Sequence, residues 1–464
     1  MGPAPAMLAG ARAYPVMLTC GALLALAFPE PGLAPLAWIS LSPLLAAGRA
    51  SEGRRGFALA FVFGAGFFGV LIVWISIIGW AAWALLVALQ ALFVACFGAI
   101  WVRCARGRMV AMRVILAAAT WVALEYIRSR IPLEGFSWGQ LAQSQTDLTW
   151  LLRIARFAGG WGVTFVVVAV NALIAETLAS FLQRKGVRSL LPAVAAAILL
   201  ALPLALPAPA MGGKRLGVSM IQGNVARATK DLTTRQEQIL ASHARLTRAV
   251  ASKNPDLVVW PESSVELDLS TSPEPQLVME RAARAAGSYL IAGVNQDAGA
   301  GRYKVTAWAL SPRGRVIERY QKTHLVPFGE YVPARGLLGG IPALRQVPSD
   351  AIPGTEPGLF ELGDLDVATV ISFEGDFGSL VREPISLGGR VLVVATNTST
   401  WGESWASAQH LAFSRLRAAE NSVWVAHAAI SGISAFVAPD GRIVARTPLW
   451  QATTLTRDVR VATG

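Results

Sequence analysis

The feature that most constrains this chain is a series of long apolar segments before Pro209. A bilayer core offers no water to the peptide groups, so apolar runs of about 20 residues cross it as helices. After Gly212, Asp, Glu, Lys and Asn return to the sequence. The 464 residues are 54% apolar and 15% charged, against about 45–50% and about 25% in soluble domains. The pattern predicts a polytopic membrane domain followed by a water-soluble one.

The boundary between the two parts is predicted near the proline-rich stretch 203–209, which Gly212 and Gly213 follow. We therefore expect a transmembrane domain over residues 1–211 and a second domain over residues 212–464. Some of the expected spans are shorter than a straight crossing requires. The seven candidate spans are 14–28, 36–47, 57–77, 80–102, 114–127, 157–182 and 190–206.

Positive charge is distributed unevenly among the connections between these spans. The net charge is +12, and basic residues follow the second, fourth and sixth spans. They are Arg49, Arg54, Arg55, Arg103, Arg106, Arg108, Arg113, Arg184, Lys185 and Arg188. Basic loops remain in the cytoplasm, so the N-terminus is predicted inside and the second domain outside. Topology explains these charges better than nucleic-acid binding, which we do not expect.

One connection departs from this alternation. The 128–156 segment should be external, yet it contains Arg128, Arg130, Arg153 and Arg156. It is also long and rich in Trp, Gln and Gly. We interpret it as a functional, partly re-entrant loop.

The second domain alternates short apolar strands with amphipathic helices, which is typical of an α/β fold. Strands are predicted at 216–222, 256–260, 289–295, 306–311, 367–373 and 391–396. Helices are predicted at 234–253, 275–286 and 405–421.

Candidate catalytic side chains follow the predicted strands. Glu262 comes after the apolar run 257–261, Lys322 lies in the segment 320–331, and Ser372 and Glu374 follow the run 367–371. Acyl transfer requires a nucleophile, a base and a charge that stabilises an oxyanion, and these residue types can supply them. From spacing alone, Glu262 could equally be a helix cap or a rim carboxylate. Lys322 could be a solvated lysine at a strand end, and Ser372 a buried hydroxyl.

The positions of cysteine and histidine limit the alternatives. Cys20, Cys96 and Cys104 all precede residue 209, so the second domain has neither a disulfide nor a cysteine nucleophile. His324 and His410 match no metal-binding spacing. We expect no metal and no cofactor.

The amino-acid sequences of three segments are more informative than the spacing between their polar residues. The segments 259–263 (VWPES), 322–333 (KTHLVPFGEYVP) and 372–374 (SFE) resemble the nitrilase superfamily. Within it they resemble most closely the apolipoprotein N-acyltransferases of bacterial lipoprotein synthesis. Gln222-Gly223-Asn224 and Gly441 fit the same pattern, as does a cluster in the membrane half: Trp121, Glu125, Arg128, Gly135, Phe136 and Trp138.

This resemblance implies a fold, a set of residue roles and two substrates. The second domain would be an α/β nitrilase-like αββα sandwich. Glu262 would be the general base, Lys322 would stabilise the oxyanion and position 372 would be the nucleophile, supported by Glu330 and Glu374. A phospholipid would donate the acyl chain, and the N-terminal amine of a diacylglyceryl-modified lipoprotein would accept it. The setting would be the bacterial plasma (inner) membrane, crossed several times, with the second domain extracytoplasmic and one more membrane helix after it.

Ser372 is the departure that bears on activity, because the family nucleophile is cysteine. A hydroxyl is harder to ionise than a thiol and needs a stronger base and better alignment. Three alternatives stay open: an acyltransferase with serine chemistry, an inactivated variant, and a silent relative that binds lipid or lipoprotein or scaffolds a partner enzyme. A membrane-tethered amidase is a further class, disfavoured by the many spans.

The segment 335–353 combines Leu337, Leu338, Ile341, Leu344 and Ile352 with glycines and prolines. It could pack on its own domain. The alternative is a lid that dips toward the lipid surface and gates the entry of acyl chains.

Overall fold

A computed structural model describes residues 10–49, 51–183, 186–210, 212–225, 231–267, 269, 272–341, 344–345 and 347–461. The chain divides into two compact units, Met1–Ala208 and Pro209–Gly464. The domain bounds 1–211 and 212–464 stay a prediction. Each unit is described separately below.

The first unit is helical. Its α-helices are α1 (Ala13–Ala25), α2 (Ser42–Arg49), α3 (Gly53–Leu71), α4 (Trp80–Cys104), α5 (Val110–Arg128), α6 (Thr149–Leu152), α7 (Ala155–Leu182) and α8 (Leu191–Ala201). Short 3₁₀ turns lie at Gly10–Arg12, Ala34–Trp38, Val73–Ile77, Leu141–Gln145, Gly186–Leu190 and Leu202–Ala205.

Five helical stretches are long and apolar enough to cross a membrane: α3, α4, α5, α7 and the run Gly186–Ala205 that contains α8. They match five of the seven predicted spans. The first two predicted spans correspond to α1, with 13 residues, and α2, with 8. Each is shorter than the about 20 residues of a straight crossing. The membrane-helix class is confirmed, and seven crossings stay a prediction.

Close approach between helices depends on glycine. A Cβ atom on Gly98 of α4 would lie 2.4 Å from the carbonyl oxygen of Gly56 on α3. A Cβ atom on Gly21 of α1 would lie 2.0 Å from the carbonyl oxygen of Phe63. Small residues allow helix backbones to approach closely in lipid, where packing rather than water exclusion holds helices together.

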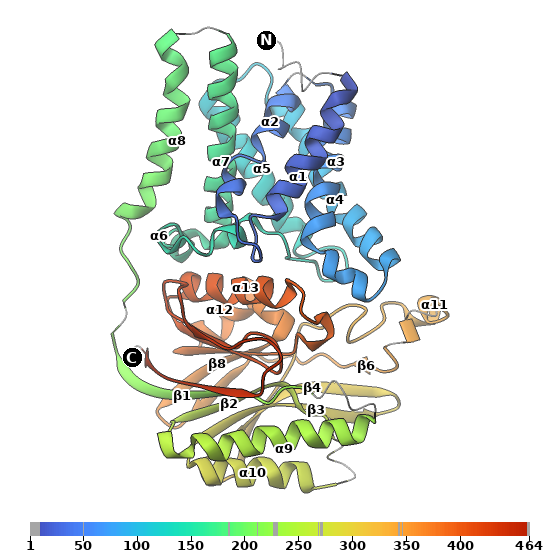
Figure 1. Cartoon of the computed structure of the whole chain (residues 1–464), viewed down its shortest axis with the longest axis vertical. Helices are drawn as coiled ribbons and strands as arrows, with labels where there is room; N and C mark the ends of the chain where they lie inside the picture. The colour runs from blue at the N-terminus through green and yellow to red at the C-terminus, as the bar shows by residue number, and fades with distance from the viewer. Residues whose placement is uncertain are drawn as a thin grey trace. The chain divides into compact units, whose positions relative to one another are not determined.

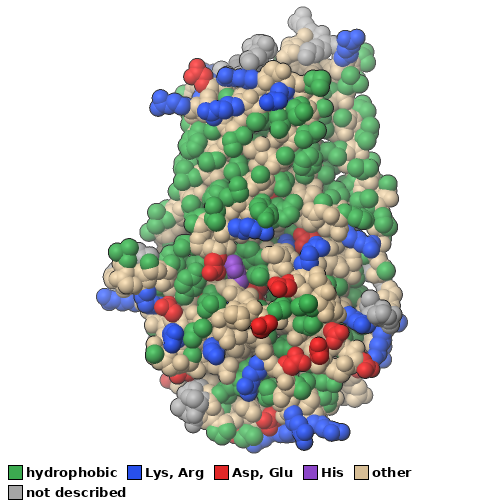
Figure 2. Space-filling model, turned by 180° about the vertical axis from the view of Figure 1, so that it is seen from behind, with side chains coloured by type: hydrophobic (Ala, Val, Ile, Leu, Met, Phe, Trp, Pro, Cys, Tyr) green, Lys and Arg blue, Asp and Glu red, His purple; other side chains and the backbone are tan. Residues whose placement is uncertain are grey.

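The basic connections meet at one end of this helical unit. Glu176, near the end of α7, pairs with Arg49 at 3.1 Å and with Arg113 at 2.5 Å. These arginines follow the second and fourth predicted spans. Figure 2 shows Lys and Arg side chains gathered at one end of the helical part, beyond a broad belt of hydrophobic side chains. The shared carboxylate is the arrangement expected if these loops lie on the same side of a membrane.

The connection between α5 and α7 is packed into the helical unit. Every residue from Ser137 to Thr146 is buried. Gln145 donates to the carbonyl of Ala34 at 3.3 Å, and the amide of Ala142 donates to Thr164 of α7 at 3.2 Å. This burial is what a re-entrant segment requires.

The second unit contains two β-sheets. The first has the order β13-β1-β2-β3-β4-β5, with β6 beside β4, and the second has the order β12-β11-β10-β9-β8-β7. The strands are β1 (Lys214–Gln222), β2 (Leu257–Val265), β3 (Tyr289–Gly299), β4 (Arg302–Leu310), β5 (Val316–Gln321), β6 (Asp350–Ala351), β7 (Leu359–Leu362), β8 (Leu365–Ile371), β9 (Val391–Thr396), β10 (Trp424–Ala429), β11 (Ala435–Val437), β12 (Ile443–Arg446) and β13 (Thr453–Val461).

Helices cover the outer face of each sheet. The covering helices are α9 (Leu232–Val250), α10 (Glu274–Ala286), α12 (Gly378–Ser386) and α13 (Ala406–Asn421), while the short α11 (Arg335–Leu338) lies in the loop before β6. Figure 1 shows α9 and α10 along β1–β4, and α12 and α13 along the sheet that contains β8. All six predicted strands and all three predicted helices overlap these elements.

Three apolar cores separate the four layers. One joins the sheets and includes Val259, Ile291 and Val393. A second, with Trp260 and Met279, lies between the first sheet and its helices, and a third, with Val394 and Leu411, lies between the second sheet and its helices. Successive residues of one strand, such as Val393 and Val394, thus enter different cores. The α/β fold is confirmed as an αββα sandwich.

Topology can be tested with reporters at two positions. The loop charges predict that alkaline phosphatase fused after Gly464 is active, because it folds only outside the cytoplasm. The same reporter inserted after Arg106, in the basic connection between α4 and α5, should be inactive. Activity only at the Arg106 position would invert the predicted topology.

Candidate active site

The candidate side chains lie within or just beyond strands of both sheets. Glu262 lies within β2, and Lys322 follows β5 directly. Ser372 follows β8 and begins a short 3₁₀ turn, Ser372–Asp376, that also contains Glu374. Glu330 lies in the loop after Lys322. The sandwich thus draws the candidates from three strands of two sheets.

Lys322 is the centre of a buried cluster of charges. Its Nζ lies 3.2 Å from Oε1 of Glu262 and 2.5 Å from Oε1 of Glu330. Lys322 is 0% exposed and Glu262 is 7% exposed. The second oxygen of each carboxylate accepts from the backbone: Asn397 donates to Glu262 at 2.9 Å, and Val326 donates to Glu330 at 2.7 Å. Because of these contacts, Lys322 is not a solvated lysine at a strand end and Glu262 is not a carboxylate at the rim of the domain. Spacing alone had allowed both alternatives.

The surroundings of this cluster change the acidity of its members. Burial is the largest effect on Glu262 and raises its pKa to about 7, with a further rise from the charge of Glu330 and an opposing effect of Lys322. Burial alone would lower the pKa of Lys322, but Glu262 and Glu330 outweigh it and raise that pKa. Near neutral pH the lysine is therefore an ammonium ion, and Glu262 can take up or release a proton.

Glu374 belongs to a neighbouring hydrogen-bond network and does not bond Lys322. Its Oε1 accepts from the Tyr320 hydroxyl at 2.7 Å and from the amide of Thr323 at 2.7 Å. Its Oε2 accepts from the amide of Ile371 at 2.7 Å. The carboxylate is 0% exposed. It ties the segment around Lys322 to the turn that carries Ser372, which is a supporting position.

Ser372 adopts an unusual backbone conformation. Its φ is +50°, in the left-handed region that L-residues with a side chain rarely occupy. Strained turns of this kind cluster at functional sites and hold a nucleophile out from a strand end. The Ser372 hydroxyl lies 3.0 Å from that of Thr396, and its side chain is half-buried.

The end of β9 connects Ser372 with the charge cluster. Thr396 contacts the Ser372 hydroxyl, and the next residue, Asn397, donates its amide to Glu262. The sequence reasoning missed both residues. The sequence pattern could have revealed both residues, because they follow the apolar run 391–395, just as Glu262 and Ser372 follow apolar runs.

Histidines approach this region without completing a triad. Nε2 of His410 lies 3.3 Å from the carbonyl oxygen of Ser372 and 3.5 Å from Oδ1 of Asp376. Burial lowers the pKa of His410 to about 4, so its ring is neutral. The ring of His324 packs against Phe377 at 4.3 Å. Within the described ranges no three His, Cys, Asp or Glu side chains are grouped as metal ligands.

The arrangement offers three of the elements of acyl transfer. Glu262 is a base whose pKa lies near neutrality, which suits proton transfer in either direction. Lys322 is a fixed positive charge in a site that excludes water, where it acts strongly on a developing oxyanion. Ser372 is a hydroxyl held at a strand end by a positive φ. The hydroxyl contacts that of Thr396.

Comparison with known proteins relates both parts of the chain to one enzyme family. Residues 20–173 match the apolipoprotein N-acyltransferase N-terminal domain, and residues 217–464 match the carbon-nitrogen hydrolase family. The apolipoprotein N-acyltransferase of Geobacter metallireducens is 33% identical, over 98% of this chain and 90% of its own length. The apolipoprotein N-acyltransferase of Gloeobacter violaceus is 30% identical, over 91% of this chain and 83% of its own length.

Solved structures similar to this chain include an amidase of the nitrilase superfamily from Nesterenkonia sp. One crystal structure of that amidase is 17% identical, covers 55% of this chain and 93% of its own, and has a TM-score of 0.42. A mutant form with acrylamide added at its active-site cysteine is 17% identical and also has a TM-score of 0.42. The match covers 53% of this chain and 93% of the amidase. From its matches along nearly the whole sequence, the chain belongs to the apolipoprotein N-acyltransferase family, with a carbon-nitrogen hydrolase domain after its membrane helices.

Proposed function

We propose that this protein moves an acyl chain from a phospholipid to the N-terminal amine of a diacylglyceryl-cysteine through an acyl-enzyme on Ser372. The acceptor would be a lipoprotein in the bacterial plasma membrane, reached from the extracytoplasmic side. The observation that carries the proposal is the buried ammonium of Lys322 between Glu262 and Glu330, beside a strained Ser372 turn. The reaction class comes from the membership of this protein in an acyltransferase family.

In the first step the Glu262 carboxylate takes the proton of the Ser372 hydroxyl. The Ser372 oxygen attacks an ester carbonyl of the phospholipid, and the ammonium of Lys322 stabilises the oxyanion. The tetrahedral intermediate collapses, and the bond to the glycerol oxygen breaks. Glu262 returns the proton to that oxygen, so a lysophospholipid leaves and an acyl ester of Ser372 remains.

In the second step the uncharged amine of the acceptor attacks the acyl ester. Glu262 takes the proton that the amine loses as the amide bond forms. The bond to the Ser372 oxygen breaks, and Glu262 returns the proton to that oxygen. The products are an N-acylated lipoprotein and the starting enzyme, so no oxidant, metal or cofactor is consumed.

Ser372→Cys tests the nucleophile. A thiol ionises more readily than a hydroxyl, so we expect acyl transfer to rise at least about tenfold, equivalent to about 1.4 kcal/mol of barrier. The measurement is the rate of acyl-enzyme formation with phospholipid labelled in its acyl chain. Adding Glu262→Gln should abolish the gain.

Equal rates for the serine and cysteine forms would show that serine is a competent nucleophile here. Activity of the double variant equal to that of Ser372→Cys would remove Glu262 from the mechanism. No acyl-enzyme in either single form would favour the alternative below.

The rate should also depend on pH through Glu262. A general base works only when deprotonated, and burial raises the pKa of Glu262 to about 7. Activity should therefore be full above that pH and fall about tenfold per unit below it. The measurement is the pH profile of acyl-enzyme formation. The matched control is Glu266→Gln on the same segment, which should keep the profile, and a midpoint near pH 4.5 would contradict the assignment.

We also propose that the segment 335–353, of which 342, 343 and 346 lie outside the described residues, acts as a lid toward the lipid surface. Arg335 and Asp350 form an ion pair at 2.5 Å that closes the base of this loop. Leu337 is 84% exposed and Ile341 is 46% exposed. Exposed apolar side chains at a loop tip are costly in water and favourable at a membrane interface.

Leu337→Asn tests the lid. Removing one exposed apolar anchor should lower the rate on phospholipid in vesicles by roughly tenfold, and leave the rate on a monomeric short-chain phospholipid unchanged. Leu232→Asn, at an exposed leucine of α9, is the control. An equal loss of rate on the vesicle phospholipid and on the short-chain phospholipid would refute the gating role. So would an unchanged rate on both.

A catalytically silent relative that binds lipid or lipoprotein is the second candidate. It is favoured by the position of the Ser372 hydroxyl, which contacts Thr396 at 3.0 Å and is bonded to no base among the described residues. In that case Ser372→Cys would form no acyl-enzyme, while the protein would still bind its lipid.

A further inference from the structure

The Ser372 hydroxyl has one hydrogen-bond partner among the described residues, and the reaction proposed above gives that partner no role. Oγ of Ser372 lies 3.0 Å from Oγ1 of Thr396. Thr396 is the last residue of β9 and is fully buried, whereas Ser372 is half-buried. Either hydroxyl has the chemistry to donate in this contact, and their difference in burial decides which of them does.

The second sheet fixes the position of the threonine hydroxyl. β8 and β9 are parallel, and Ile371 lies opposite Ala395 in their register. Ser372 and Thr396, the residues that come next, therefore meet at the carboxyl ends of the two strands. On its other side, Thr396 lies opposite Ala429 of β10. A β-branched side chain has few χ1 choices, so this backbone pairing also sets the direction of the hydroxyl.

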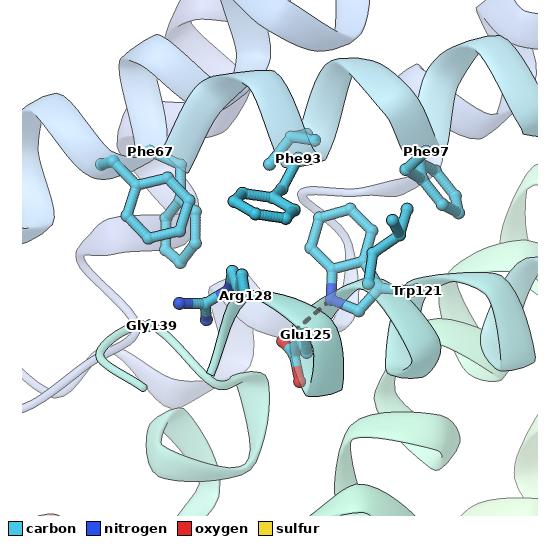
Figure 3. A pocket seen from close by; sticks show the side chains of 10 residues that line it. Phe67, Phe93, Phe97, Trp121, Glu125, Arg128 and Gly139 are labelled. Carbon is cyan, nitrogen blue, oxygen red and sulfur yellow. Dashed lines mark hydrogen bonds between the residues drawn. The ribbon is translucent and has the colours of Figure 1, made fainter. Parts of the chain in front are cut away.

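Other buried threonines show what a hydroxyl in such a place requires. The Thr247 hydroxyl donates to a backbone carbonyl at 2.8 Å. In the first unit, the Thr164 hydroxyl donates at 3.0 Å to Glu125, a carboxylate that also accepts from the indole of Trp121 (Figure 3). A buried hydroxyl without an acceptor costs free energy. We therefore expect Thr396 to donate to an oxygen of the protein as well.

Thr396 is the donor in its contact with Ser372. It has no access to solvent, and Oγ of Ser372 is its one side-chain hydrogen-bond partner in the described part of the chain. If Ser372 donated instead, the Thr396 proton would be buried without an acceptor. The half-buried Ser372 hydroxyl has no such restriction, because its own proton can be given to water or to a base. Burial thus assigns the proton between the two oxygens to Thr396.

We propose that Thr396 is a positioning residue that donates a hydrogen bond to Oγ of Ser372 and thereby adapts this site to a serine nucleophile. This role rests on the acyl transfer proposed above and adds a residue to it. When Glu262 removes the serine proton, Thr396 keeps its own proton, and its hydrogen bond stabilises the negative charge that develops on Oγ. A sulfur nucleophile gains less from the same hydroxyl, because sulfur is a weak hydrogen-bond acceptor.

The same strand end also holds the proposed base. The amide of Asn397, the residue after Thr396, donates to Oε2 of Glu262 at 2.9 Å. A substitution that displaced the end of β9 as a whole would therefore change the surroundings of Glu262 as well as those of Ser372. The pH midpoint of the rate, which depends on Glu262, reports such a displacement. Loss of the Thr396 hydroxyl alone should leave that midpoint where it is.

The test compares Thr396→Val in the serine chain and in the Ser372→Cys form. Valine keeps the shape of threonine and removes the hydroxyl. With phospholipid labelled in its acyl chain, we expect acyl-enzyme formation to slow at least about tenfold in the serine chain and less than about twofold in the cysteine form. Thr396→Ser, which keeps a hydroxyl, should retain at least about half the rate of the serine chain. The pH midpoint of the serine chain should stay near 7.

Thr369→Val is the matched control. Thr369 of β8 is also fully buried, but its hydroxyl has no hydrogen-bond partner in the part of the chain that the structure describes. Its removal should leave the rates of both the serine and the cysteine forms within about twofold. If Thr396→Val does not fold, the smaller Thr396→Ala takes its place, with the same expected difference between the serine and cysteine forms.

Three results would overturn the proposal while acyl transfer itself stands. They are an equal loss of rate in the serine and cysteine forms, a pH midpoint that moves with Thr396→Val, and an unchanged rate of the serine chain. The first two would give Thr396 a purely structural role. If neither the serine chain nor Ser372→Cys forms an acyl-enzyme, the proposed function fails, and the role of Thr396 fails with it.

Discussion

The second unit is organised around one buried positive charge. Lys322 is inaccessible to solvent, and a lone ammonium there would be strongly unfavourable. Glu262 and Glu330 stabilise it, and their remaining oxygens accept backbone N–H groups of Asn397 and Val326. Two carboxylates and one ammonium leave a surplus of one negative charge. Burial is the main reason that the pKa of Glu262 rises to about 7, and the negative charge of Glu330 raises it further.

The same cluster explains why loops rather than strands determine the site. Glu262 and Lys322 are 60 residues apart, and Glu262 and Asn397 are 135 apart. The strands set the distances, and the final alignment depends on polar contacts between the segments that follow them. Glu374 provides the most of these, because it joins Tyr320 and Thr323 to Ile371, the residue before Ser372. Substitution of Glu374 would therefore disturb both sides of the site at once.

Charge has two different roles in the membrane unit. Glu176 of α7 pairs with Arg49 of α2 and Arg113 of α5, so that these three helices are joined at one end of the unit. Arg128 differs, since Phe136, Trp138 and Gln90 occupy only one of its nitrogens. Gly135, with φ of +90°, lets the chain turn back so that the carbonyls of Phe136 and Trp138 reach that nitrogen. The first arrangement joins three helices, and the second holds the loop after α5 against the end of that helix.

The sequence by itself determined the two-part architecture, because the length of an apolar run and the spacing of strands depend on local composition. It also provided Glu262, Lys322, Glu330, Ser372 and Glu374 as candidates, because the segments that contain them resemble those of a known family. Tertiary structure alone decided that Glu330 pairs with Lys322, that Glu374 bonds Tyr320 and the amides of Thr323 and Ile371, and that Thr396 faces the Ser372 hydroxyl. Local sequence carries no information on which distant partner completes a hydrogen bond or an ion pair, since that depends on how separate strands and loops converge.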